Sequence, residues 1–322
     1  MAARAPCGFL SRIVAFHKTW LSILVLFLLY STSTNAFYGL SGPRRSQFVS
    51  VLYASTPSKL PVVGSSFYAE VRKQATEAVQ AGLKAGFEQM EIEFPISPGR
   101  IDVSLGEFLD DSREWTREFV RPFTPKGAKL WVIFPDGKEA TLAGKRWGGV
   151  NFRIMGIDTA MKASKDEPCE LQIAVTPGFN VQEYINLEKV RRPGVPMIVV
   201  NGNLDRIRGG YYPRIFYPGL YNVKERMLQY FEPVYYLKPA QGGFIFRKFP
   251  EEWQQVLAYY DLQPGTGRGR GDKGRKEVLT KVVATSEERP AYNDVVNALK
   301  KESLSMARAA QEAQEAAERE AG

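Results

Sequence analysis

The stretch KLWVIFPDG, residues 129–137, contains five consecutive apolar residues closed by a Pro-Asp-Gly turn. A continuous apolar run of this length indicates a strand that is buried on both faces, which is typical of parallel sheets. Two further runs of this kind follow at residues 171–175 and 197–200. Between them, Asn180 is placed to cap a helix, with Glu183 at the capping-box position. This alternation predicts an α/β fold with a mostly parallel sheet flanked by helices.

Two helices are predicted upstream of this region. Residues 67–85 carry apolar side chains at steps of three and four, which indicates an amphipathic helix. Ser104 is followed three residues later by Glu107, the spacing of a capping box, and a helix is predicted from there to about Val120. The alternation of helices and strands therefore begins near the start of the core.

Residues 90–94 lie between these helices and alternate between apolar and acidic side chains. The alternation predicts a strand with Glu91 and Glu93 on one face. Paired carboxylates can perform acid–base chemistry or bind a divalent cation. A solvated strand face is the interpretation that we favour for these two residues.

The core domain, residues 60–262, ends with a different pattern. Two strands are predicted around a turn at residues 241–243, which indicates an antiparallel hairpin. Residues 250–260, PEEWQQVLAYY, predict a closing helix. Residues 263–276 are rich in Gly and Arg and predict a flexible linker. Residues 277–322 predict a helical tail.

Residues 1–36 predict a secretory signal peptide. Basic residues precede an apolar run at residues 20–30, which is half of the roughly 20 residues that a membrane span needs. Small residues then lead to an expected cleavage after Ala36. A membrane anchor is the alternative interpretation of this run.

Residues 37–59 predict a transit peptide, because they are rich in Ser, Arg and small residues and contain no acidic residue. A signal peptide followed by a transit peptide, with Phe37 at the junction, resembles the bipartite presequence of complex plastids in diatoms and related algae. The resemblance implies a plastid protein. No second long apolar run follows, so we expect the stromal side, with thylakoid association, rather than the lumen.

Removal of this presequence changes the composition. The whole chain has a net charge of +8, whereas residues 60–322 have 37 Lys and Arg against 35 Asp and Glu. This near-neutral balance argues against nucleic-acid binding. Removal also takes His17 and Cys7, which excludes Ser-His-Asp triads, Cys-His dyads and Cys/His zinc sites. Cys169 remains, either as a small buried apolar residue or as a redox thiol.

The core segments, taken in order, resemble a known family. They are EVRKQATEAVQAGLKAG, EIEFP, LWVIFPDG, PMIVVNGN and GGFIFRKFPEEWQQV. This order is similar to DUF1995, a domain of unknown function of plants, algae and cyanobacteria, over about residues 60–262. The family includes plastid proteins related to low photosystem II accumulation assembly factors, and some plastid adenylate kinases carry such a domain. The resemblance implies a role in photosystem assembly and brings no catalytic residues.

Polar side chains follow the predicted strands, where open parallel sheets bind ligands. Arginines and a helix N-terminus there could hold an anion such as phosphate. Turns and helix caps are the competing explanation for the same Asp and Asn residues. The candidate ligand-binding residues are Asp136, Asn180, Asn201, Asp205 and Arg206, with Glu93, Thr176 and Asn203 beside them.

The segment RIRGGYYPRIFYPGLY, residues 206–221, combines aromatic and arginine side chains, which are enriched in interface hot spots. Exposed, it would dock a protein or the membrane interface; buried, it would be an ordered loop packed on the sheet. The candidate docking residues are Arg208, Tyr211, Tyr212, Arg214, Phe216 and Tyr217.

Two functions follow from these observations. The first is a non-enzymatic plastid factor for photosystem biogenesis that docks a protein partner, such as photosystem subunits or a thylakoid insertase, with peripheral membrane contact. The second is an enzyme or binding protein for a phosphorylated metabolite or nucleotide at the strand ends. We assign no catalytic residue, no metal ligand and no cofactor from the sequence.

Overall fold

The computed structural model describes residues 59–62, 64–98, 103–125, 129–163, 167–178, 180–260 and 278–321. Residues 1–58 of the predicted presequence and the whole predicted Gly/Arg linker lie outside these residues. The described strands form one nine-stranded sheet with the order β3-β2-β4-β5-β1-β6-β7-β8-β9.

The first six strands of this order are parallel, which confirms the predicted α/β fold with a mostly parallel sheet. Each is short except the last. They are β1 (Gln89–Glu93), β2 (Leu130–Phe134), β3 (Arg153–Gly156), β4 (Leu171–Val175), β5 (Met197–Val200) and β6 (Glu232–Ala240).

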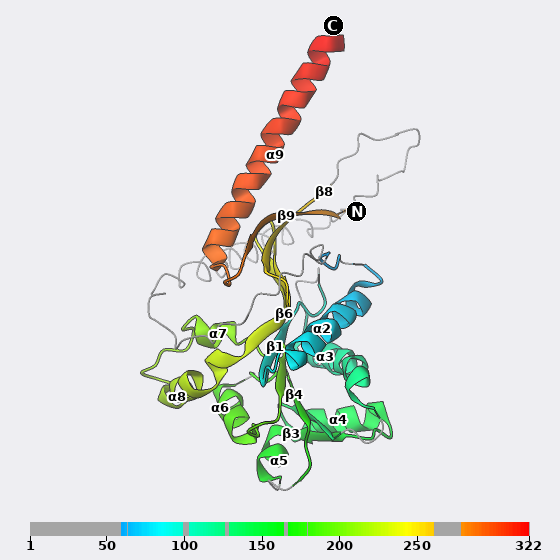
Figure 1. Ribbon diagram of the computed structural model, residues 1–322, viewed down its shortest axis with the longest axis vertical. Helices are drawn as coiled ribbons and strands as arrows, with labels where there is room; N and C mark the ends of the chain where they lie inside the picture. Colours follow the sequence, from blue (N-terminus) through cyan, green and yellow to red (C-terminus); the bar gives the residue numbers. More distant parts are fainter. Residues whose placement is uncertain are drawn as a thin grey trace, which may run out of the picture. The chain divides into compact units, whose positions relative to one another are not determined.

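Helices cover both faces of this parallel part (Figure 1). On one face lie α2 (Phe67–Lys84), α3 (Leu105–Val120) and α4 (Gly137–Trp147). On the other face lie α5 (Ile157–Lys162), α6 (Val181–Val190), α7 (Asp205–Arg208) and α8 (Pro218–Arg226). Two short 3-10 turns complete the connections, η1 (Arg121–Phe123) and η2 (Leu228–Tyr230).

Strand β2 shows why the continuous apolar runs are strands. Val132 packs into the core on the α2–α3 side, whereas Trp131 and Ile133 pack into the core on the α6–α8 side. All five residues of the strand are buried. A strand with a helix layer on each face has no solvated side, so its sequence is apolar without alternation.

The predicted helix starts are confirmed. The backbone N–H of Glu107 donates to Ser104 Oγ at 3.2 Å, and Ser104 N–H donates back to Glu107 Oε2 at 2.9 Å, which completes the capping box. Asn180 Oδ1 accepts from the backbone N–H of Glu183 at 3.0 Å and caps α6.

The C-terminal half of the sheet is antiparallel. The predicted hairpin is confirmed, because β6 pairs with β7 (Gly243–Lys248) around the turn at Gln241 and Gly242. Two further strands continue the antiparallel order, β8 (Trp253–Tyr260) and β9 (Val278–Ser286).

The predicted closing helix at residues 250–260 is wrong, since β8 occupies this segment. Trp253 and Leu257 pack on one side of the strand, and Val256 packs on the other. Residues spaced by four share a face in either a helix or a strand, so this pattern does not separate the two. The exposed edge of β7 decides the outcome, because β8 satisfies its backbone N–H and C=O groups.

The predicted helical tail is correct only for its second part. Residues 278–286 form β9 instead, consistent with the Val and Thr content of VLTKVVATS. The helix α9 (Tyr292–Ala321) follows, and its first turns bury Val295 and Leu299 beside Tyr236. Among the helices that the structure describes, none is long and apolar enough to span a membrane.

The β7–β8 pairing can be tested by replacing Gly243 with Ala. A Cβ atom at Gly243 would lie 1.9 Å from the carbonyl oxygen of Val256, so the two strands would have to separate. We expect Gly243→Ala to reduce the free energy of unfolding by about 1–3 kcal/mol, measured by urea denaturation.

Gly144 is the matched control, because it lies in α4 with no atom within 4 Å of an added Cβ. Gly144→Ala should raise the free energy of unfolding by about 0.5–1 kcal/mol. Equal stabilities of the two variants would contradict the β7–β8 pairing described above.

Candidate functional site

A pocket lies at the carboxyl ends of the parallel strands, at the point where neighbouring connections diverge. The chain leaves β1 toward α3 on one face of the sheet and leaves the adjacent β5 toward α7 on the other face. Open α/β sheets bind their ligands in the crevice created by such a divergence. The pocket has a volume of about 440 Å³, within the range of small-molecule sites.

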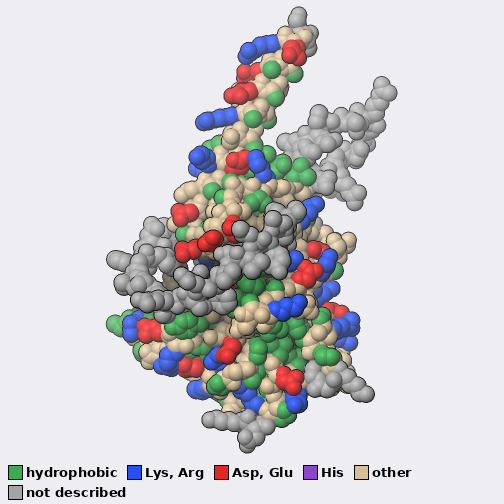
Figure 2. Space-filling view, in the orientation of Figure 1, with side chains coloured by type: hydrophobic (Ala, Val, Ile, Leu, Met, Phe, Trp, Pro, Cys, Tyr) green, Lys and Arg blue, Asp and Glu red, His purple; other side chains and the backbone are tan. Residues whose placement is uncertain are grey.

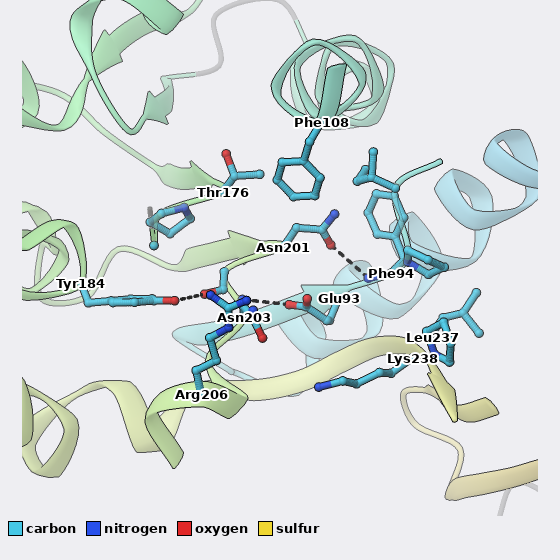
Figure 3. A pocket seen from close by; sticks show the side chains of 16 residues that line it. Glu93, Phe94, Phe108, Thr176, Tyr184, Asn201, Asn203, Arg206, Leu237 and Lys238 are labelled. Carbon is cyan, nitrogen blue, oxygen red and sulfur yellow. Dashed lines mark hydrogen bonds between the residues drawn. The ribbon is translucent and has the colours of Figure 1, made fainter. Parts of the chain in front are cut away.

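The lining of this pocket is divided between polar and apolar side chains (Figure 3). The polar residues are Glu93, Thr176, Tyr184, Asn201, Asn203, Arg206 and Lys238. The apolar residues are Phe94, Pro95, Ile96, Phe108, Pro177, Leu237 and Pro239.

The backbone around the pocket adopts an uncommon conformation. Thr176, Asn201 and Asn203 have φ angles of 45°, 48° and 50°. Ser97, which follows the lining residue Ile96, has a φ of 50° and is the fourth and last non-glycine residue with positive φ among the described residues. The left-handed region costs about 1–3 kcal/mol for such residues, least for Asn, and strain of this kind clusters at functional sites.

Asn201 is fixed at one end of its amide and unpaired at the other. Its Oδ1 accepts from the backbone N–H of Phe94 at 3.0 Å. The backbone N–H of Asn201 donates to the carbonyl of Ile92 at 2.8 Å. The residue is only 7% exposed, yet its Nδ2 has no hydrogen-bond partner. Figure 3 shows this amide nitrogen turned away from Phe94 toward the side of the pocket lined by Phe108. The buried hydroxyl of Thr176 also lacks a partner.

Glu93 occupies the polar side of the pocket. Its Oε2 accepts from the backbone N–H of Asn203 at 3.1 Å (Figure 3). Desolvation, together with the negative charges of Glu91 and Asp205, raises the pKa of Glu93 to about 8, although Lys238 opposes the shift. The carboxyl group is therefore mainly protonated at pH 7 and can donate a hydrogen bond.

Asp205 lies at the start of α7, next to the lining residue Arg206 in the chain, and ion pairs hold its carboxylate in place. Its carboxylate pairs with Arg289 at 2.5 Å and with Lys238 at 2.9 Å, and it accepts from the Tyr236 hydroxyl at 2.5 Å. Burial alone would raise the pKa of Asp205, but the two cations outweigh burial and hold the pKa below its usual range. Asp205 is therefore an ionised structural anchor. Arg289, from the segment between β9 and α9, had no signal in the sequence.

Glu91 is fully buried, which makes the favoured prediction of a solvated strand face wrong for this residue. Its Oε2 pairs with Arg208 Nη1 at 2.5 Å, and Arg208 Nη2 donates to the carbonyl of Phe231 at 2.7 Å. Arg208 is thus turned into the protein. It does not lie on a docking surface, contrary to the expectation from the sequence.

The structure separates the candidate ligand residues into two groups. Asn201 and Arg206 line the pocket, and Asp205 adjoins it. Asp136 and Asn180 are not among the lining residues and act as helix caps; Asp136 Oδ1 accepts from the N–H groups of Lys138 and Glu139. The capping explanation therefore holds for these two residues.

The loop at residues 209–217 presents a cluster of exposed apolar side chains. Tyr211, Ile215, Phe216 and Tyr217 are 61%, 82%, 74% and 37% exposed. Figure 2 shows hydrophobic side chains gathered at the left of the view, over the α7–α8 segment. Ile215 is aliphatic, so the aromatic and arginine content of this segment gave no signal for it in the sequence.

Tyr212 is the inward-facing member of this loop, unlike the docking residue that the sequence suggested. Its half-buried ring contacts Tyr184 of the pocket, with ring centroids 6.4 Å apart. It also contacts Tyr211 at 5.1 Å and Tyr217 at 5.3 Å. Arg214 stays at the surface and pairs with Glu225 at 3.6 Å.

The described residues contain no group of three or more His, Cys, Asp or Glu side chains that could hold a metal ion. Cys169 is half-buried against the core on the α6–α8 side, and burial raises the pKa of its thiol to about 11. A protonated thiol is a poor nucleophile, which favours the packing interpretation of this residue.

The family model for the domain of unknown function DUF1995 matches residues 66–297. The chain belongs to the DUF1995 family. The matched region runs from α2 into the first turns of α9, so it extends past residue 262, where the resemblance in the sequence was expected to end. Comparisons with curated proteins and with solved structures give no significant match.

The Glu91–Arg208 pair should make a large contribution to stability. Arg208→Met leaves the Glu91 carboxylate buried without its counter-charge, so we expect the free energy of unfolding to fall by about 3–5 kcal/mol in urea denaturation. Adding Glu91→Gln should recover most of this loss, because the double variant no longer buries an unpaired charge.

Arg214→Met is the control, since it removes an exposed ion pair with Glu225. It should change the free energy of unfolding by less than about 1 kcal/mol. A loss as small for Arg208→Met would show that Glu91 is hydrated or protonated rather than paired.

Proposed function

We propose that this DUF1995 protein is a non-enzymatic plastid auxiliary factor that docks a protein partner through the loop at residues 209–217. The observation that supports the proposal is the exposure of Tyr211, Ile215 and Phe216 in one short loop. Contiguous exposed apolar side chains on a folded surface mark interaction sites more often than isolated ones do.

The composition of this loop fits protein recognition. Tyr and Arg are enriched among residues that dominate binding energy, and here Arg214 lies beside Phe216 and Tyr217 in the chain. The charge and aromatic rings favour a partner surface with an apolar pocket and an acidic rim. Membrane contact alone is the competing outcome of the test below.

The loop is also held in one conformation before any partner binds. The N–H of Tyr211 donates to the carbonyl of Arg206 at 2.9 Å, and the N–H groups of Phe216 and Tyr217 donate to the carbonyl of Pro213. The Tyr212 ring anchors the loop from inside. A preorganised loop loses less conformational entropy on binding, which favours affinity.

The cellular setting of the proposal rests on the sequence. Residues 1–59 have the composition of a signal peptide followed by a transit peptide, and they resemble the presequences of complex plastids. The family resemblance suggests photosystem biogenesis, with photosystem subunits or a thylakoid insertase as the partner on the stromal side.

The docking proposal predicts that Ile215→Ser/Phe216→Ser loses the partner without unfolding. Both side chains are mostly exposed, so the change in the free energy of unfolding should stay within about 0.5 kcal/mol. The tagged chain is used to capture proteins from gently solubilised plastid membranes, and photosystem subunits or insertases are quantified by mass spectrometry. We expect their recovery to fall at least about tenfold, the loss of about 1.4 kcal/mol of binding energy.

Leu142→Ser is the matched control, because Leu142 is an exposed apolar residue on α4, across the sheet from the loop. It should retain the partner. Recovery that is equal for the double variant and the control would refute docking through this loop. Binding of the wild type to protein-free thylakoid-lipid vesicles, lost in the double variant, would assign the loop to the membrane instead.

The presequence predicts the destination of the protein. A fluorescent reporter fused behind residues 1–59 should accumulate in the plastid of a diatom, as seen by microscopy. A fusion to residues 1–36 alone should stop before the plastid stroma, because it lacks the acid-free segment. Secretion of the longer fusion would remove the plastid setting while leaving the docking surface open to test.

A further inference from the structure

We propose that the pocket at the carboxyl ends of β1, β4 and β5 binds a small organic oxyanion whose apolar body lies against Phe94, Ile96 and Phe108. This is a binding site distinct from the exposed loop at residues 209–217. Its support comes from the backbone, an unpaired polar group and the charges of the lining.

The backbone evidence is that the non-glycine residues with positive φ angles lie around the pocket. The positive φ angles at Ser97, Thr176, Asn201 and Asn203 all occur around this one pocket, and none occurs at another non-glycine residue of the described chain. Thr is β-branched and has no intrinsic preference for this region. Asn tolerates this region, so the strain lies mainly at Ser97 and Thr176, and strained residues persist only where the surrounding structure holds them, as it does at ligand sites.

The unpaired group is the Asn201 amide. Because Oδ1 is occupied by the N–H of Phe94, Nδ2 is the end of the amide that is left buried without a partner, and Figure 3 shows it on the Phe108 side of the pocket. A buried donor without an acceptor costs about 1–3 kcal/mol, so an acceptor atom supplied by a ligand would recover that free energy. The lining therefore favours a ligand that carries a hydrogen-bond acceptor.

The charges of the lining favour an acceptor that is negative. Arg206 and Lys238 both line the pocket, and Figure 3 shows their side chains running from α7 and β6 toward the side on which Glu93 lies. Lys238 also pairs with Asp205 at 2.9 Å, so its charge is shared between this carboxylate and the pocket. Protonated Glu93 adds no opposing charge near pH 7. A carboxylate or phosphate head group near these residues would accept from the cations and from the Glu93 hydroxyl. A second acceptor atom of the ligand would reach Asn201 Nδ2 on the Phe108 side.

The apolar side of the pocket indicates the chemistry of the rest of the ligand. Phe94, Ile96, Phe108, Leu237 and three prolines present carbon atoms to the cavity. A bare inorganic anion would leave this wall facing water. A body of about one or two rings would cover it, and burying about 100 Å² of apolar surface would contribute about 2.5 kcal/mol.

The experiment compares three probes by isothermal titration calorimetry with the full-length chain at pH 7: 1-naphthyl phosphate, 1-naphthol and inorganic phosphate. We expect saturable binding of 1-naphthyl phosphate with a Kd below about 1 mM. The other two probes should bind at least about tenfold more weakly, because each satisfies only one half of the lining. Equal affinity for 1-naphthol and 1-naphthyl phosphate would refute the requirement for an anion. If none of the three probes binds, the proposed site is refuted.

Two variants place the probe in this pocket. Asn201→Asp keeps the acceptor for the Phe94 N–H and a side chain that tolerates positive φ, but removes the amide donor and introduces an acid. Arg206→Gln removes one lining cation. Each should weaken binding of 1-naphthyl phosphate at least about tenfold while urea denaturation shows a folded chain. Arg206→Gln carries the smaller risk of a folding defect, so an unchanged affinity for 1-naphthyl phosphate in this variant would overturn the proposal.

The pH dependence tests the role of Glu93. The titratable and charged groups around Glu93 are Glu91, Asp205, Lys238, Tyr184 and Tyr236. Burial and the two carboxylates outweigh Lys238 and place the pKa of Glu93 at about 8. Above this pH the ionised carboxylate repels the anion, so affinity should fall up to about tenfold from pH 7 to pH 9. Glu93→Gln mimics the protonated form and should abolish this fall. An identical fall in that variant would exclude Glu93 from the site.

The variant Ile215→Ser/Phe216→Ser separates this proposal from the proposed docking function. It should bind 1-naphthyl phosphate like the wild type while losing the protein partner. Loss of probe binding in this variant would show that the probe occupies the exposed loop and would refute the pocket as its site.

Discussion

The ion pair between Glu91 and Arg208 is the interaction on which the arrangement of the site depends. Glu91 lies on the central strand β1, between helix layers, with no solvent contact. A carboxylate in such a position needs a counter-charge, and Arg208 supplies it from the end of α7. The pair therefore fixes a helix of four residues, too short to be stable alone, against the sheet.

Once α7 is fixed, its other residues organise distant parts of the chain. Asp205, one turn before Arg208, receives Lys238 from β6 and Arg289 from the C-terminal segment. The guanidinium of Arg289 also lies 4.4 Å from the centre of the Tyr236 ring. These contacts join the parallel and antiparallel halves of the sheet. The family match continues beyond the predicted linker to residue 297 and therefore includes Arg289.

The sequence predicts the local features of this fold well and the long-range ones poorly. Buried parallel strands and capped helices leave signals within about ten residues, and the runs at 130–134 and 171–175 and the Ser104 cap were all confirmed. The prediction of a helix at residues 250–260 failed because the spacing of Trp253 and Leu257 fits a helix and a strand alike. The strand is selected by its pairing with β7, which is a tertiary contact.

The site shows the same division between local and long-range information. The position of Asn201 after a buried strand was enough to place it at the carboxyl edge of the sheet. The burial of Glu91 was not predictable, because an acidic residue in an alternating strand normally faces water. Its partner Arg208 is separated from it by more than one hundred residues, and neither residue alone indicates the other.

The pocket and the exposed loop are in contact through Arg206, and the size of the resulting coupling can be bounded. Arg206 lines the pocket, and its guanidinium lies 5.6 Å from the centre of the Tyr211 ring in the loop. A head group that drew Arg206 inward would end this cation–π contact, which is worth about 0.5–1 kcal/mol at an exposed site. Since about 1.4 kcal/mol corresponds to a tenfold change in affinity, the effect on docking would be several-fold at most.

The contact between Tyr184 and the half-buried Tyr212 holds the base of the loop whether or not the pocket is filled. Anion binding at this site would therefore adjust the docking surface without switching it on or off.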